Sequence, residues 1–169
     1  MTTDFSKELT VFTDGSALCN KKDAPAGWAM YIPCKKVLIS KGMFGTNNQA
    51  ELEAIRYALW YLKEHINDYA SYVHDAKIFI LSDSEYSINT ITGRYKPKTN
   101  TNKILACQIL IRDLKKLGYK ICFHHVMAHT GGSDYVSYNN NIVDVAARKR
   151  ATELKGGDEG GDEGKNDEK

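Results

Sequence analysis

Three short stretches near the start of the chain have the polar and apolar pattern of strands. Polar and apolar residues alternate over 9–13, and the run stops at Asp14-Gly15-Ser16, a turn signal. Residues 27–32 and 36–40 form two further apolar runs, with Pro33 between them. A proline between two apolar runs indicates a connection, so the pattern predicts three consecutive strands of a meander.

After these strands the periodicity changes to that of a helix. Leu52, Ile55, Leu59 and Leu62 recur at helical spacing, which predicts a helix over about 49–65. Thr46-Asn47-Asn48 can cap its start. Further along, we expect a strand over 77–81, helices over 85–92 and 103–117, a strand over 119–126, a loop over 128–138 and a helix over 141–154. This order predicts an α/β fold in which helices flank a mixed sheet.

The end of the chain differs in composition from the rest. Residues 156–169 contain six acids, two lysines and no apolar residue, and they repeat Gly-Gly-Asp-Glu. Such a segment cannot bury enough surface to fold, so we predict one domain over 1–155 and a disordered tail over 156–169. The chain carries a net charge of +2 and the tail −4, which leaves +6 for the domain. A basic domain favours a polyanionic partner.

Length and composition exclude several classes of protein. A chain of 169 residues suits a single domain, and we expect a monomer. No apolar run reaches the roughly 20 residues that span a bilayer, and no signal-like segment is present. We therefore expect no membrane contact and a cytoplasmic or nuclear location, including that of a virus-infected cell. The cysteines lack zinc-site spacing and are expected to be reduced thiols; they are Cys19, Cys34, Cys107 and Cys122.

Four carboxylates stand where a predicted element meets a loop. Asp14 and Asp83 follow apolar strands, and ligand sites of open α/β sheets collect at the carboxyl ends of strands. Glu51 lies in the first turn of its helix, at the end of the buried stripe, whereas we expect Glu53 to face solvent. Asp144 is predicted in the first turn of the final helix. The elements therefore place these four acids where they can converge.

Each of these acids also has an ordinary explanation. An acid in the first turn of a helix interacts favourably with the macrodipole, by about 0.3–1 kcal/mol, and Asp before Gly often only forms a turn. Four converging acids would repel one another unless a divalent cation neutralised them. Because oxygen ligands without Cys or His favour magnesium or manganese over zinc, the group predicts a site for such a cation.

The segments around these acids resemble ribonuclease H of type 1, in the same order and with similar spacing. The segments are Phe12–Ser16, Thr46–Leu52, Ser82–Tyr86 and Asn140–Ala146. The similarity covers about residues 8–152. It implies the RNase H-like fold, with a five-stranded mixed sheet and helices on both faces. It also implies an endonuclease that hydrolyses the RNA strand of RNA–DNA hybrids.

The resemblance gives the acids a role in metal binding and catalysis. It implies that Asp14, Glu51, Asp83 and Asp144 bind two Mg²⁺ ions, for which Mn²⁺ is expected to substitute. One ion would activate the attacking water and the other would stabilise the leaving 3′-oxygen, as in sites with ions about 3.5–4 Å apart. The expected products are a 5′-phosphate and a 3′-hydroxyl.

A histidine near the end of the predicted sheet also matches the family. His129, in the segment Ala128–Gly132, resembles the mobile histidine that handles protons and assists product release. An imidazole suits this work because it titrates near neutrality. We expect His124 and His125, which lie in a predicted strand, to be structural.

The resemblance further implies contacts with the hybrid. Amide side chains can donate and accept hydrogen bonds across the shallow minor groove of such a duplex. Thr46 matches the threonine of the family's phosphate pocket and Asn102 its asparagine partner, although helix capping also explains Thr46. The implied substrate-binding residues are Gly15, Ser16, Asn20, Thr46, Asn47, Asn48, Glu85, Asn102 and Asn140.

Two departures from the family pattern bear on substrate binding. Glu85 stands where bacterial members carry a glutamine, and its carboxylate could accept a hydrogen bond from a 2′-hydroxyl or a guanine amino group. The basic handle that carries tryptophans in many relatives is reduced here to Arg94, Tyr95, Lys96 and Lys98. We therefore expect a lower affinity for the hybrid, or help from a partner.

Other activities fit parts of this pattern. A resolvase or exonuclease of the same fold that acts on DNA would keep the acidic cluster, but such enzymes generally lack the Asn47-Asn48 pair and the His129 segment. An inactive hybrid-binding module would have lost one of the acids, and all four are present. We expect a free-standing enzyme rather than a reverse transcriptase fragment, because the chain starts at Met1 and carries no polymerase portion.

Overall fold

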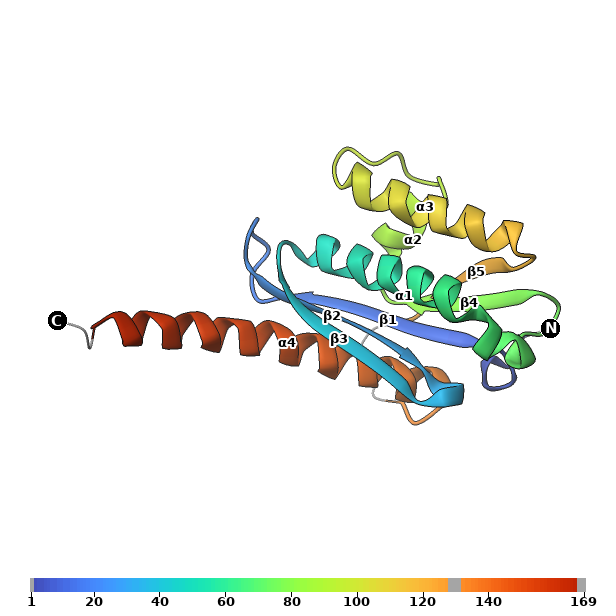
Figure 1. Cartoon of the computed structure of the whole chain (residues 1–169), viewed down its shortest axis with the longest axis horizontal. Coiled ribbons are helices and arrows are strands. Elements are labelled where there is room, and N and C mark those ends of the chain that lie inside the picture. The colour runs from blue at the N-terminus through green and yellow to red at the C-terminus, as the bar shows by residue number, and fades with distance from the viewer. Residues whose placement is uncertain (1, 128–131, 167–169) are drawn as a thin grey trace.

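A five-stranded sheet lies between two layers of helices in the computed structural model, which describes residues 2–127 and 132–166, with side chains as far as Gly156 (Figure 1). The strands are β1 (Thr10–Ala17), β2 (Pro25–Ile32), β3 (Val37–Phe44), β4 (Lys77–Ser82) and β5 (Lys120–His125). The helices are α1 (Asn47–Tyr69), α2 (Glu85–Ile91), α3 (Thr101–Lys116) and α4 (Tyr135–Asn166). Short 3-10 turns cover Phe5–Lys7, Pro33–Lys35 and Ala70–Tyr72.

The sheet has the strand order β3-β2-β1-β4-β5. The first three strands form an antiparallel meander, and β4 runs parallel to both β1 and β5. Helices α1, α2 and α3 lie on one side of the sheet and α4 on the other (Figure 1). The predicted α/β fold, a mixed sheet of five strands with helices on both faces, is therefore confirmed.

Helix α1 is the long helix that the leucine periodicity predicts. Thr46 caps it: its hydroxyl accepts a hydrogen bond from the Gln49 amide at 3.2 Å, and the Gln49 side chain accepts from the Thr46 amide at 2.9 Å. The predicted stripe packs on the sheet, and Leu52, Leu59 and Leu62 are fully buried. Burial of each such side chain stabilises the fold by about 1.5–3 kcal/mol.

Helix α4 packs closely on the opposite face of the sheet. Val143 and Ala147 join a second cluster of buried residues, which also contains Phe12 of β1. A Cβ on Gly27 of β2 would lie 2.2 Å from the Ala147 carbonyl oxygen, so only glycine permits this approach. The close packing fixes the position of Asp144, which lies between Val143 and Ala147 along the helix.

Several element boundaries differ from those predicted: β3 continues to Phe44 and α1 to Tyr69, and two further differences bear on the site. Strand β1 does not stop at Asp14 but continues to Ala17, paired with β2 throughout. Helix α4 starts at Tyr135 rather than near residue 141, because the Asp134 carboxylate accepts a hydrogen bond from the Ser137 amide at 3.2 Å and caps it. Asp144 therefore lies in the third turn of α4, and its predicted place in the first turn is wrong.

The region of the predicted tail is helical along its backbone as far as Asn166. The ribbon of α4 continues past the end of the sheet in Figure 1. Disorder of residues 156–169 stays a prediction, as does the domain boundary at residue 155.

One side chain is placed differently from its prediction. Glu53 was expected to face solvent but is partly buried and pairs with Arg56 and Lys103. The difference arises because Lys103 belongs to α3, which packs on α1, and the pattern of a single helix does not show this neighbour. Among the described residues, no helix is long and apolar enough to cross a membrane.

Candidate metal centre

The site begins where strands β1 and β4 stop pairing. Thr13 and Ser82 form the last pair of this parallel ladder. Asp14 and Asp83 follow directly, so the two carboxylates lie side by side where the parallel ladder of β1 and β4 ends, although β1 itself continues to Ala17. Asp14 is 3% exposed and Asp83 is partly buried. The Asp14 side chain also accepts a hydrogen bond from the Gly15 amide at 2.9 Å.

Gly15 explains how Glu51 reaches the two aspartates. A Cβ at position 15 would lie 2.2 Å from the backbone nitrogen of Glu51, so the missing side chain lets the first turn of α1 lie against β1. Asp14-Gly15 therefore does not form the predicted turn. Gly15 instead lets the backbones of β1 and α1 approach each other closely. Glu51 is 4% exposed, and its Oε2 atom is buried without a hydrogen-bond partner among the residues that the structure describes.

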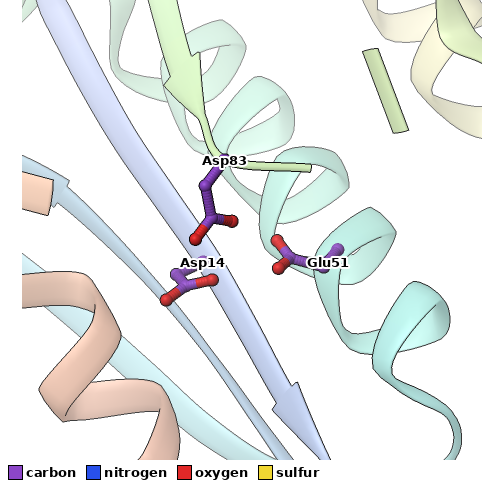
Figure 2. A group of neighbouring side chains, drawn as sticks. All are labelled: Asp14, Glu51 and Asp83. Carbon is purple, nitrogen blue, oxygen red and sulfur yellow. The ribbon is translucent and has the colours of Figure 1, made fainter. Parts of the chain in front are cut away.

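The three carboxylates point toward one another (Figure 2). One oxygen from each of Asp14, Glu51 and Asp83 lies within 4.8 Å of the others. Asp144 borders the group: it is 8% exposed, and its charge raises the pKa of Asp14. The Asp144 carboxylate also accepts a hydrogen bond from the Arg148 guanidinium, one helical turn later. Three of the predicted acids therefore form one cluster, and the fourth lies next to it.

Burial and repulsion both disfavour ionisation of this cluster. Desolvation, with the neighbouring Asp83 charge, raises the pKa of Asp14 to about 8. Desolvation and the charges of Asp14 and Asp83 raise the pKa of Glu51 well above its usual value. Strongly shifted carboxyl groups in a buried cluster are typical of functional sites, because structural packing alone rarely tolerates them.

The cluster has the properties of a site for a hard divalent cation. Its donor atoms are all oxygens, which Mg²⁺ and Mn²⁺ prefer. A cation would also give a partner to the unpaired Glu51 Oε2 atom and remove the repulsion that raises the pKa values. The residues present therefore fit the metal that the sequence predicts, with Asp14, Glu51 and Asp83 as the nearest ligands.

Several predicted substrate contacts gather where β1 ends and α1 begins. The Ala17 amide donates to the Asn47 side chain at 3.3 Å, which ties the two elements together. Gly15 is buried in this junction, Ser16 is partly buried, and Asn48 is exposed beside the Thr46 cap. Polar groups therefore line the junction next to Glu51. Asn20, by contrast, is exposed in the loop after β1.

The remaining predicted site residues are dispersed. Glu85 is exposed at the start of α2, and Asn102 is exposed in the first turn of α3. Asn140 of α4 is 6% exposed, and within the described part of the chain its Oδ1 atom is buried without a hydrogen-bond partner. Asn140 is thus less accessible than its predicted role as a substrate contact requires. His129 lies outside the described residues.

The structure adds three residues that the sequence reasoning did not single out for the site. His125 Nε2 lies 3.1 Å from the Asp83 carbonyl oxygen, a backbone contact consistent with the expected structural role. Arg148 pairs with Asp144, and its spacing of four residues on a helix could have indicated this contact. Asn100 precedes α3 and donates to the Tyr86 hydroxyl at 3.2 Å.

Comparisons of the sequence with known proteins agree on one family. Residues 6–152 match the family model described as RNase H. A protein named "Ribonuclease H" from Tropheryma whipplei strain Twist is 40% identical over 155 residues, covering 86% of each chain. Another "Ribonuclease H", from Caldicellulosiruptor saccharolyticus, is 30% identical over 163 residues, covering 88% of this chain and 99% of the relative.

Solved structures share the fold at lower identity. LC11-RNase H1, isolated from compost, superposes with a TM-score of 0.65 at 23% identity, covering 88% of this chain and 98% of the neighbour. The crystal structure of LC11-RNase H1 in complex with an RNA/DNA hybrid gives a TM-score of 0.63 at 22% identity, covering 87% and 99%. At these identities the likeness concerns the fold alone.

Proposed function

The chain belongs to the RNase H family, and on that premise we propose that it is an endonuclease that hydrolyses the RNA strand of RNA–DNA hybrids. The observation that carries this proposal is the cluster of Asp14, Glu51 and Asp83, three oxygen donors within 4.8 Å of one another. Its position at the end of the parallel ladder of β1 and β4 leaves it next to the polar junction of β1 and α1. A phosphate backbone that lies along this junction would contact both the junction and the carboxylate cluster.

Metal ions would supply charge neutralisation and an activated water. Asp14, Glu51, Asp83 and Asp144 would hold two Mg²⁺ ions, or Mn²⁺, for hydrolysis of the phosphodiester. The expected products are a 5′-phosphate and a 3′-hydroxyl. The unpaired Glu51 Oε2 atom and the charge of Asp144 beside Asp14 support this assignment.

The protein's own groups would orient the hybrid and move protons. Asn47 and Asn48 are exposed at the start of α1, where amides can meet base edges and 2′-hydroxyls of a minor groove. Thr46 keeps its hydroxyl in the helix cap, so its backbone and side chain are held rigid for a phosphate contact. His129 would handle protons near the scissile phosphate. Gly15 would set the distance between β1 and α1, and Ser16, Asn20, Glu85, Asn102 and Asn140 would contact the substrate.

Separate labelling of the two strands tests this function. A hybrid labelled on the RNA strand in one sample and on the DNA strand in another is incubated with the protein and Mg²⁺. We expect shortened RNA with 3′-hydroxyl ends and intact DNA. Asp14→Asn should abolish the cutting, and His129→Ala should reduce it less. Shortened DNA, or RNA ends carrying a cyclic phosphate, would contradict the proposal.

A further inference from the structure

A second polar pocket lies beside α1, and none of the clustered carboxylates lines it. It has a volume of about 340 Å³ and lies between β2, β3, α1 and the first turn of α3. Its charged lining residues are Lys41, Glu53, Arg56 and Lys103, and Met43 and Tyr57 add apolar surface. Three cations therefore share one carboxylate, which leaves an excess of two positive charges.

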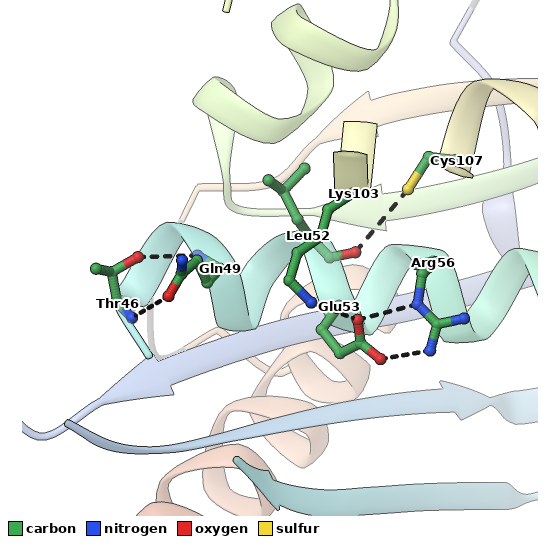
Figure 3. A network of polar contacts seen from close by, with 7 residues as sticks. All are labelled: Thr46, Gln49, Leu52, Glu53, Arg56, Lys103 and Cys107. Carbon is green, nitrogen blue, oxygen red and sulfur yellow. Dashed lines mark hydrogen bonds and ion pairs between the residues drawn. The ribbon is translucent and has the colours of Figure 1, made fainter. Parts of the chain in front are cut away.

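Glu53 holds two of these cations in fixed positions (Figure 3). It accepts hydrogen bonds from Arg56 Nε at 2.9 Å and from Lys103 Nζ at 2.9 Å, and Arg56 Nη2 adds a further bond. Burial alone would raise the pKa of Glu53, but the bonds from Arg56 and Lys103 outweigh it and hold the pKa below its usual value. The carboxylate thus stays ionised and keeps both cations ordered, which reduces the entropy that a ligand must offset.

These cations retain hydrogen-bonding capacity for a ligand. Within the described part of the chain, Arg56 Nη1 has no hydrogen-bond partner, and Lys103 donates only to Glu53. Lys41 is exposed and forms no ion pair there. It is paired with Trp28 across β2 and β3, and the Trp28 ring lies 4.7 Å from the Tyr57 ring. The pocket therefore combines unsatisfied donors with an aromatic wall.

We propose that this pocket binds a backbone phosphate of the nucleic acid, at a distance from the phosphate that is cut. Guanidinium and ammonium groups are the protein's phosphate ligands, and an aromatic wall beside them suits the sugar of the same nucleotide. The proposal rests on the proposed function, because it assumes a nucleic acid held at the carboxylate cluster.

The spacing along α1 fits this arrangement. Arg56 follows Glu51 by five residues, which is about 8 Å of helix axis. A strand of duplex advances about 3.4 Å per nucleotide, so this offset along the helix axis corresponds to two or three nucleotide steps.

A purely structural role for the ion pairs is the competing explanation, since they join α1 to α3. Lys41 separates the two explanations because it lies outside the Glu53 network. If the ion pairs are purely structural, neutralising Lys41 should change neither the stability of the protein nor its binding of nucleic acid. If the pocket is a phosphate site, neutralising Lys41 should weaken binding of nucleic acid and leave stability unchanged.

Binding of a fluorescent hybrid is the test, measured by anisotropy in the Asp14→Asn background so that no cutting occurs. We expect Lys41→Gln to weaken binding about 3- to 10-fold at moderate salt and to reduce the slope of log affinity against log salt by about 0.9, the loss of one phosphate contact. Lys41→Arg should keep both values. Lys116→Gln, a lysine in the last turn of α3, is the matched control for the loss of one charge.

The outcomes separate this inference from the proposed function. Equal affinity and salt slope for Lys41→Gln and Lys116→Gln would overturn the phosphate site, whether or not the native protein cuts hybrids. Failure of the native protein to cut hybrids would instead contradict the proposed function.

Hybrids with a single neutral methylphosphonate linkage locate the contact. We expect one linkage whose neutralisation weakens binding to the Lys41-containing protein but not to Lys41→Gln. If no linkage on either strand behaves in this way, the pocket does not bind a backbone phosphate.

Discussion

Burial and the repulsion of neighbouring carboxylates act on the same two side chains, Asp14 and Glu51. Both are nearly inaccessible. Desolvation and the charges of Asp83 and Asp144 raise the pKa of Asp14, and desolvation and the charges of Asp14 and Asp83 raise the pKa of Glu51. Folding into this arrangement costs free energy unless protons or a cation neutralise the cluster. We therefore expect protons and divalent cations to compete for these carboxylates.

This competition predicts how stability without divalent cations depends on pH. The folded pKa of Asp14, about 8, exceeds the usual value near 4 of an unfolded chain, so the folded state binds the proton more tightly. The contribution of Asp14 to the free energy of unfolding is therefore fully present below about pH 4 and is lost as the pH rises through 8. Asp14→Asn removes this dependence and should raise stability in chelator at pH 8 by about 0.5–2 kcal/mol.

Denaturant unfolding in chelator at several pH values measures the difference between the native protein and Asp14→Asn. The difference should grow from pH 5 to pH 8 and shrink when Mg²⁺ is added to the native protein. A difference independent of pH would contradict the burial-driven shift.

Gly15 is the second residue on which the site depends. Gly15→Ala would place a Cβ against the Glu51 backbone, and backbone cannot move aside as a flexible side chain can. We expect a loss of stability of about 1–3 kcal/mol or more, together with a loss of metal-dependent activity because α1 and Glu51 shift.

Gly156→Ala is the control, since a Cβ there would meet nothing within 4 Å. Thermal unfolding of both variants measures the difference in their stability. If Gly15→Ala were as stable and as active as Gly156→Ala, the close approach would not explain the glycine.

At the scale of elements, the sequence predicts most of the fold but fewer of the boundaries. The stripe from Leu52 to Leu62 and the apolar run of β4 carry strong periodicity, and both elements lie where they are predicted. Strand β1 was ended too early because Asp14-Gly15 reads as a turn when the neighbouring helix is unknown. The start of α4 was missed because the cap at Asp134 lies within a glycine-containing loop.

The same limits apply to the site. Asp14, Glu51 and Asp83 could be brought together from strand ends and a helix start, because topology alone makes those places adjacent. The partial burial of Glu53 depends on how α3 packs on α1, which a pattern along one chain does not contain. The pairing of Asp144 with Arg148, by contrast, lies within one helix, and its spacing of four residues indicates it. Asn140 was predicted to contact the substrate but is nearly buried, and its burial also depends on how α4 packs.

The tail offers a prediction at this scale. Residues 156–169 contain no apolar side chain and five glycines, each unfavourable in a helix by about 1 kcal/mol relative to alanine. Removal of this segment should therefore change the free energy of unfolding by less than about 0.5 kcal/mol. Urea unfolding of both chains measures this. A loss of more than about 1 kcal/mol would show that the segment packs on the domain.

At the scale of the whole molecule, charge and architecture fit one partner. The chain outside residues 156–169 carries a net charge of +6, which favours a polyanionic partner. The carboxylate cluster is locally negative, so a phosphate can approach it only when cations neutralise its charge. The polar junction of β1 and α1 contains Asn47 at the start of α1, and the pocket at Lys41 is lined by Glu53 and Arg56 further along the same helix. A duplex held across these turns would place one phosphate at the metals and another at the pocket.

The most direct measurement compares three duplexes of the same sequence: an RNA–DNA hybrid, duplex RNA and duplex DNA, each with Mg²⁺ or with chelator. We expect rapid cutting of the hybrid with Mg²⁺, little cutting of the other two duplexes, and none of any substrate with chelator. Preferential cutting of duplex DNA, or cutting of the hybrid that persists in chelator, would contradict the proposed function.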